Sequence, residues 1–152
     1  MVSYLGLCGL AHREALAQVK GYAQRSGIAV ERIAAIPYPP SIFRWSGLIK
    51  SPTGVYRGMI DLTAPASPSY AFFPDSVSDN YLQQAEAIPD VQTFLWFARF
   101  PWVSYRREDN RSIVEFQDIQ FYAPRRSGRL PFTFRVSFDG QGRVASYGLL
   151  GR

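Results

Sequence analysis

The sequence predicts an α+β domain: an antiparallel sheet of about six or seven strands, with an N-terminal helix and a mid-chain helical pair. The chain has 152 residues, of which 47% are apolar and 19% charged, and this composition suits a folded domain with its own core. Aromatic residues make up 15% and lie mainly in short alternating runs, which are typical of strands. Several runs flank turn sequences in pairs, and this favours antiparallel hairpins.

Residues 1–26 are expected to form the N-terminal helix, which Gly27 ends. Its apolar stripe consists of Ala11, Ala15, Leu16, Val19, Tyr22 and Ala23. The opening MVSYLGLCGLA is apolar, whereas the following residues are amphipathic and basic. We therefore expect this helix to continue from a membrane helix that is missing here; an ordinary amphipathic helix with an apolar start is the alternative. Residues 27–152 would then be a single α+β domain.

The next segment is expected to begin with a strand and a hairpin. Residues 28–36 predict the strand. The runs FRWSGLIK and GVYRGMIDL then flank SPTG, a good hairpin signal. The stretch that follows, TAPASPSYAFFP, is rich in proline and serine and is predicted to be a loop.

Two short helices are predicted in the middle of the chain. SDNYLQQAEA forms the first. Pro89 ends it and opens the second, because proline is well tolerated in a first helical turn. Apolar residues recur at helical spacing in the second helix and are expected in the core: Val91, Phe94, Leu95 and Ala98.

The last third of the chain is predicted to consist of strands. Two more hairpins are expected there: WVSYRR and SIVEFQDIQFY around EDNR, then FTFRVSF and RVASYGLL around DGQG. From Phe132 to Phe138, apolar residues alternate strictly with polar ones. This strand should therefore have one core face and one polar face.

The charge distribution is uneven. The net charge is +5, and 15 of the 17 basic residues are arginine. From Arg125 onward there are six arginines and one acid, Asp139. This excess could face nucleic acid or anionic lipid, but a solvated strand face is the favoured interpretation. Nucleic-acid binding is disfavoured because no recognition motif is present and the aromatic residues alternate with polar ones, as core rings do.

The sequence assigns no catalytic residue, metal ligand or cofactor to this chain. The single histidine, His12, has no carboxylate or second histidine at ligand spacing. The single cysteine, Cys8, cannot form an internal disulfide or, alone, a metal site. Neither a phosphate-binding loop nor a nucleophile elbow is present.

Four charged residues lie inside or at the end of apolar runs: Arg44 in IFRWSG, Asp61 in GMIDL, Arg99 in FLWFARFPW and Asp118 in VEFQDIQF. Burying an unpaired guanidinium is costly, so we expect Arg99 to be shut away from water and paired with Asp118 by charge-assisted hydrogen bonds. The favoured interpretation is a structural pair that fixes a helix-to-strand corner. The alternative is the polar floor of an aromatic pocket, whose candidate binding residues are Arg44, Trp45, Tyr56, Arg99, Trp102 and Asp118.

Six stretches of the sequence indicate a resemblance to a known family. The two most specific are PYPPSIFRW and FLWFARFP, and the four weaker ones are HREALAQV, GVYRGMIDL, VEFQDIQF and FRVSFDGQGRV. Together they resemble, over nearly the whole chain, the C-terminal region of the bacterial LexA-regulated inner-membrane metal-dependent hydrolase family. Gln120 departs from the pattern of that family, which often has arginine at this position.

The resemblance implies a soluble accessory or binding domain of an inner-membrane hydrolase, whose partners are the transmembrane part of the same protein and anionic lipid. The metal chemistry of the family rests on histidine and aspartate motifs among N-terminal membrane helices. None of these motifs is in this sequence, so a divalent metal would belong to the full-length family member. The basic residues Arg13, Lys20 and Arg25 place this region on the cytoplasmic side by the positive-inside rule.

Two alternatives stay open, and with them the question whether the chain is an enzyme. The first is a hydrolase-type domain that binds a small anionic or lipid-like substrate through Arg44 and Arg99. The second is a nucleic-acid-binding module. The sequence does not predict the oligomeric state.

Overall fold

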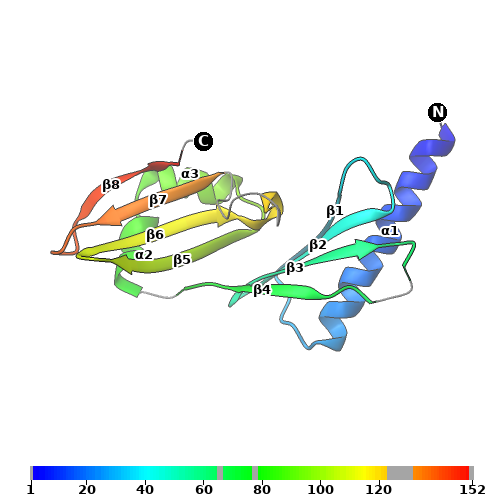
Figure 1. Cartoon of the computed structure of the whole chain (residues 1–152), viewed down its shortest axis with the longest axis horizontal. Helices are drawn as coiled ribbons and strands as arrows, with labels where there is room; N and C mark the ends of the chain where they lie inside the picture. Colours follow the sequence, from blue (N-terminus) through cyan, green and yellow to red (C-terminus); the bar gives the residue numbers. More distant parts are fainter. Residues whose placement is uncertain (1, 65–66, 77–78, 123–131, 151–152) are drawn as a thin grey trace. The chain divides into compact units, whose positions relative to one another are not determined.

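The computed structural model describes residues 2–64, 67–76, 79–122 and 132–150, which fall into two compact units, Met1–Phe73 and Pro74–Arg152 (Figure 1). Each unit contains an antiparallel four-stranded sheet with helical residues packed on one face. The α+β class is confirmed, as are the N-terminal helix and the mid-chain helical pair. The expected count of six or seven strands is wrong, because eight strands are described and they form two sheets.

The first unit has one long helix and a sheet with the order β1-β2-β3-β4. Its elements are α1 (Val2–Arg25), β1 (Arg32–Pro37), β2 (Arg44–Ser51), β3 (Gly54–Asp61) and β4 (Tyr70–Pro74). The predicted hairpin around SPTG is confirmed as β2 and β3. Strand β4 lies where the sequence predicted only a loop, so the YAFFP end of that proline-rich stretch is an edge strand instead.

Helix α1 packs on the first sheet through the second half of its length. Ala15, Val19 and Ala23 are buried and share a core with Trp45 and Ile49 of β2. The predicted helical stripe therefore faces the sheet, as its spacing requires. None of the helices in the described parts of the chain is long and apolar enough to cross a membrane.

The end of α1 confirms the predicted stop at Gly27. This glycine has φ +62°, a left-handed conformation that costs glycine little. The N–H of Gly27 donates to Gln24 O at 3.2 Å, and that of Ile28 donates to Ala23 O at 3.0 Å. This pair of bonds is a Schellman motif, which satisfies carbonyl groups that the helix end would otherwise leave without donors.

A glycine pair in the first sheet makes room for the side chain of Tyr70 from β4. Gly47 of β2 and Gly58 of β3 lie directly opposite each other. The side chain of Tyr70 occupies the space that their missing side chains leave, and its ring stacks on Tyr22 of α1 with the centroids 4.1 Å apart. Because the two glycines lack side chains, Tyr70 can pack over the central strands and against α1 at the same time.

The second unit has two short helices and a sheet with the order β5-β6-β7-β8. Its elements are α2 (Asp79–Glu86), α3 (Pro89–Phe97), β5 (Pro101–Glu108), β6 (Arg111–Asp118), the 3-10 helix η1 (Ile119–Phe121), β7 (Thr133–Phe138) and β8 (Val144–Leu149). Both hairpins predicted for the last third of the chain are confirmed, as β5–β6 and β7–β8.

The two faces of the second sheet differ sharply in chemistry. Helices α2 and α3 cover one face, where Val91 and Phe94 pack with Phe116, Phe134 and other apolar strand residues (Figure 1). The alternation predicted for β7 is confirmed, because its apolar residues are buried on this face. The polar residues Arg106, Glu115, Gln117 and Arg135 therefore lie on the opposite face, whereas Ser112 and Asp118 of β6 share the face of the apolar core.

We predict that Gly58→Ala lowers the free energy of unfolding by about 1–3 kcal/mol. A Cβ atom at this position would lie 2.8 Å from Ser69 O and 2.9 Å from the Tyr70 ring, so β4 would have to move. Urea unfolding followed by circular dichroism measures the change. Gly9→Ala on α1 is the matched control, since no atom lies within 4 Å of the added carbon. That substitution should stabilise the protein by about 0.5–1 kcal/mol through helix propensity. Equal effects of the two substitutions would refute the packing role of Gly58.

Candidate functional site

Asp118 is a buried carboxylate with four hydrogen bonds to the residues around it. It is 1% exposed and lies at the end of β6. Its carboxylate accepts the main-chain N–H of Arg99 at 2.9 Å, of Phe100 at 3.3 Å and of Gln120 at 3.1 Å. The side-chain Nε2 of Gln120 donates a further bond at 2.8 Å. Asp118 thus caps η1 and holds the segment that leads from α3 into β5.

The link between positions 99 and 118 exists, but it runs through the main chain. Arg99 is exposed, so the prediction that its guanidinium is shut away from water is wrong. Helix α3 ends before it, and the C-cap residue Ala98 is extended, with φ −67° and ψ 125°. Side chains alternate along extended backbone, so Ala98 and Phe100 point into the core while Arg99 points outward. Its two adjacent residues are therefore on the buried side of the chain, whereas Trp96 and Phe97, further back in the same apolar run, are exposed as Arg99 is.

The six candidate binding residues are divided between the two units. Arg44, Trp45 and Tyr56 belong to the first unit. Arg44 is exposed and pairs with Asp61 at 3.4 Å across β2 and β3. Trp45 is buried, and its Nε1 donates to Ile42 O at 2.9 Å. The ion pair joins β2 to β3 and the Trp45 bond fixes the turn before β2, so neither contact needs a ligand to explain it.

Tyr56, the remaining candidate of the first unit, makes a ring contact, and so does His12. Tyr56 stacks on Phe72 of β4, with ring centroids 4.3 Å apart. His12, on α1, lies 5.4 Å from the Trp45 ring and is itself exposed. Both contacts join an element to the sheet beside it, which is a structural role.

Arg99, Trp102 and Asp118 belong to the second unit. Trp102 donates its Nε1–H to Pro74 O at 2.7 Å and thereby anchors the start of the unit to β5. Four arginines of the basic C-terminal excess, Arg125, Arg126, Arg129 and Arg152, lie outside the described residues. Among the described residues, no group of three or more histidine, cysteine, aspartate and glutamate side chains could hold a metal ion.

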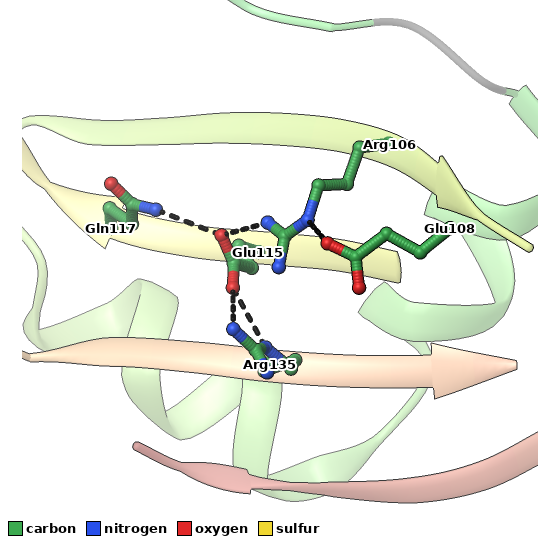
Figure 2. Close-up of polar contacts among 5 residues, drawn as sticks. All are labelled: Arg106, Glu108, Glu115, Gln117 and Arg135. Atoms are coloured by element: carbon green, nitrogen blue, oxygen red, sulfur yellow. Dashed lines mark hydrogen bonds and ion pairs between the residues drawn. The ribbon is translucent and has the colours of Figure 1, made fainter. Parts of the chain in front are cut away.

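The structure assembles a polar cluster that the sequence analysis missed, on the sheet face opposite α2 and α3 (Figure 2). We call it the Glu115 cluster: Arg106, Glu108, Glu115, Gln117 and Arg135. Glu115 of β6 is buried and accepts from Arg106 Nη1 at 2.6 Å and from Arg135 Nε at 2.8 Å. The two arginines reach it from the two neighbouring strands (Figure 2). Arg106 also donates to Glu108 at 2.6 Å.

The electrostatics of the cluster keep Glu115 ionised. Burial alone would raise the pKa of this carboxyl, but the hydrogen bonds and charges of Arg106 and Arg135 outweigh it and hold the pKa below its usual value. A carboxylate so strongly held as an anion is poorly matched to proton transfer near neutral pH. Two arginines and two glutamates also cancel in charge. The cluster is therefore suited to joining three strands and offers no general acid or base.

One atom of the cluster lacks a hydrogen bond among the described residues. Gln117 is buried, and its Nε2 makes only a long contact with Glu115, at 3.4 Å, while its Oε1 accepts nothing from those residues. The strand alternation of β6 could have placed Glu115 and Gln117 on the polar face. It could not have placed Arg106 and Arg135 beside them, because these residues are 9 and 20 positions from Glu115 and are brought to it only by the register of two strand pairs.

Comparison with known proteins finds no matching family model, no matching curated protein and no similar solved structure.

We predict that Asp118→Ala lowers the free energy of unfolding by about 3 kcal/mol or more, because three main-chain N–H groups lose their acceptor. Arg99→Ala should cost about 1 kcal/mol or less, since the N–H of residue 99 is kept whatever its side chain. Urea unfolding compares the two variants. Asp118→Asn, which keeps one acceptor oxygen, should fall between them. A larger loss for Arg99→Ala than for Asp118→Ala would show that the guanidinium holds the corner after all.

The lowered pKa of Glu115 predicts how stability depends on pH. The reference value is 4.5 and the folded value is lower, so the stabilising contribution is complete above about pH 4.5 and is lost as the pH falls through the folded pKa. Glu115→Gln should therefore lower the free energy of unfolding by about 1–3 kcal/mol at pH 7, and by progressively less in acid. Urea unfolding over a pH series measures both quantities.

Glu108→Gln is the control for this experiment. Glu108 contacts the same Arg106, but its side chain is largely exposed, so its ion pair should contribute less than about 0.5 kcal/mol. A Glu115→Gln deficit that stays constant from neutral to acid pH would contradict the assigned role of its charge.

Proposed function

We propose that this chain is a non-catalytic binding domain that α1 holds at a membrane surface, as the accessory domain of an inner-membrane hydrolase. The observation that carries the proposal is the exposure of three leucines at the start of α1. Leu5, Leu7 and Leu10 are 65%, 53% and 64% exposed. Three exposed leucines so close together on one helix indicate a surface that binds an apolar partner, such as a protein or a lipid bilayer.

The positions of these leucines support a membrane as the apolar partner. At about 100° per residue, Leu7 and Leu10 lie far around the helix from Leu5, so the three do not form one stripe. A helix that is apolar on several sides is typical of segments surrounded by core or lipid. By contrast, the buried residues of the second half of α1 share one side, which packs on the sheet.

Basic residues follow the apolar half of α1. Arg13, Lys20 and Arg25 are all exposed. Each basic residue near an anionic lipid surface contributes about 1 kcal/mol of attraction. The arrangement of apolar residues followed by a basic flank supports insertion of the first turns among lipid chains, with the sheet on the cytoplasmic side.

The buried acids of the second unit support a binding role over a catalytic one. Asp118 has its oxygens occupied by main-chain and amide donors, and Glu115 is held as an anion between two arginines. Both carboxylates therefore maintain the fold. The hydrolase part of the proposal rests on the sequence resemblance, and the transmembrane part of the same protein is the proposed partner.

The test is flotation with vesicles of phosphatidylethanolamine and phosphatidylglycerol. The wild-type chain should float with these vesicles, and less of it should float with phosphatidylcholine vesicles, which carry no net charge. The triple variant Leu5→Ser, Leu7→Ser, Leu10→Ser should partition about 100-fold less, on an estimate of about 1 kcal/mol for each half-buried leucine.

A double variant of the same unit, Val30→Ser and Met59→Ser, is the control. It removes two exposed apolar side chains that lie away from the first turns of α1, and it should float as the wild type does. Equal flotation of the triple variant and the wild type would remove the support for a membrane role of α1. Turnover of ester or phosphate substrates by the chain would favour the enzyme alternative.

A further inference from the structure

We propose that the outer edge of β8 pairs with the same edge of a second copy of this chain, as an antiparallel two-fold pair. The proposal is independent of membrane binding. Among the described strands, β8 has a neighbour on one side only, which is β7. Its sequence, VASYGL, contains no proline and no charged residue. An uncharged, apolar edge of this kind is a template for pairing with another strand.

The contrast with the other edge strands makes β8 distinctive. Proline and charged side chains are the usual means by which a sheet edge is kept from pairing. The other three edges that the structure describes carry such residues: Arg32 and Pro37 on β1, Pro74 on β4, and Pro101, Arg106, Arg107 and Glu108 on β5. Only β8 is left without this protection.

The side chains of β8 extend the core of the second unit to the edge of the sheet. Tyr147 lies opposite Val136 and Leu149 opposite Phe134, so both point to the face that carries the apolar core. The Tyr147 ring also stacks on Phe134, at 6.4 Å between centroids. Yet Tyr147 is 52% exposed and Leu149 61% exposed. The apolar layer is therefore left uncovered at this edge.

The main chain at the same two residues is directed outward. The N–H of Leu150 donates to Thr133 O at 2.8 Å, so residue 150 is bonded to β7. Hydrogen-bonding direction alternates along a strand, and Gly148 and Ser146 should bond to β7 in the same way. The N–H and C=O groups of Tyr147 and Leu149 then point away from β7, toward the open edge.

These groups match each other in a two-fold pair centred on Gly148. In that register Tyr147 lies opposite Leu149 of the second copy, and Leu149 lies opposite its Tyr147. Each of the two pairs can exchange two N–H···O bonds, and each places an aromatic ring beside a leucine on the core face. The helices of both copies then lie on the same side of one eight-stranded sheet.

A second copy fits this edge better than an unrelated strand does. The edge has no charge that would select a partner of opposite sign. Its outward groups and its two apolar side chains are already complementary to themselves under two-fold rotation, which is the commonest symmetry of protein oligomers. The occupant that the geometry specifies is thus another β8.

Disulfide trapping tests both the interface and its register. In the proposed pair, Ser146 lies opposite Leu150 of the second copy, at a non-hydrogen-bonded position where Cβ atoms approach closely enough for a disulfide. The variant Ser146→Cys, Leu150→Cys in a Cys8→Ser background should form a disulfide-linked dimer in mild oxidant. Within one copy these two positions are about 13 Å apart along the strand, so they cannot bond to each other.

The single variants Ser146→Cys and Leu150→Cys, in the same background, are the matched controls. In this register, equivalent positions of the two copies are too far apart to cross-link, so both singles should stay monomeric on non-reducing gels. Cross-linking of the double variant alone supports the proposal. Equal cross-linking of the singles and the double, or none in any variant, overturns it.

Sedimentation equilibrium of the unmodified chain gives a second, independent readout. The wild type should show a reversible monomer–dimer equilibrium. Leu149→Pro removes an outward N–H and keeps the Leu150 bond to β7, so it should shift the equilibrium to monomer with an unchanged far-ultraviolet circular dichroism spectrum. A wild type that is monomeric at all concentrations, or a folded Leu149→Pro variant that dimerises as the wild type does, contradicts the proposal.

Discussion

The second unit depends on one carboxylate that gathers the main chain around it. Asp118 accepts N–H groups from Arg99 and Phe100, where α3 gives way to β5, and from Gln120, where β6 gives way to η1. These groups lie at the ends of regular elements, and buried N–H groups without acceptors are costly. An apolar residue at position 118 would leave them unsatisfied. The carboxylate therefore decides where the helix stops and where the first strand of the sheet begins.

The two faces of the same sheet handle charge in opposite ways. The face under α2 and α3 is largely apolar. Its buried polar residues include Ser112, which shares a hydrogen bond with Tyr105, and Asp118, whose bonds go to main-chain groups and to Gln120. The other face carries Glu115, which three strands share through Arg106 and Arg135 (Figure 2). In both places the buried charge is compensated within the fold. The two surfaces that we propose for interaction are instead apolar: the start of α1 in the first unit and the edge of β8 in the second.

Much of the secondary structure could be predicted because it depends on near neighbours in sequence. The stop at Gly27, the stripe of α1, the turns of three hairpins and the alternation of β7 each follow from a local period or a local conformational preference. Strand β4 could not be predicted in this way, since its proline- and serine-rich surroundings favour a loop. Its position beside the sheet depends on the space that Gly47 and Gly58 leave for the side chain of Tyr70.

The sequence predicted a link between positions 99 and 118 through the guanidinium, whereas the structure shows a bond from the main-chain N–H of Arg99. The apolar residues around Arg99 in the sequence predicted a buried guanidinium. The extended backbone after Ala98 instead turns that side chain outward and its N–H inward. Likewise, the polar face of β6 was readable from alternation, whereas the meeting of Glu115 with two arginines required the register of three strands. The periodicity of a helix or strand depends on residues that are close in sequence. The hydrogen-bond partners across strands depend on the register of the whole assembled sheet.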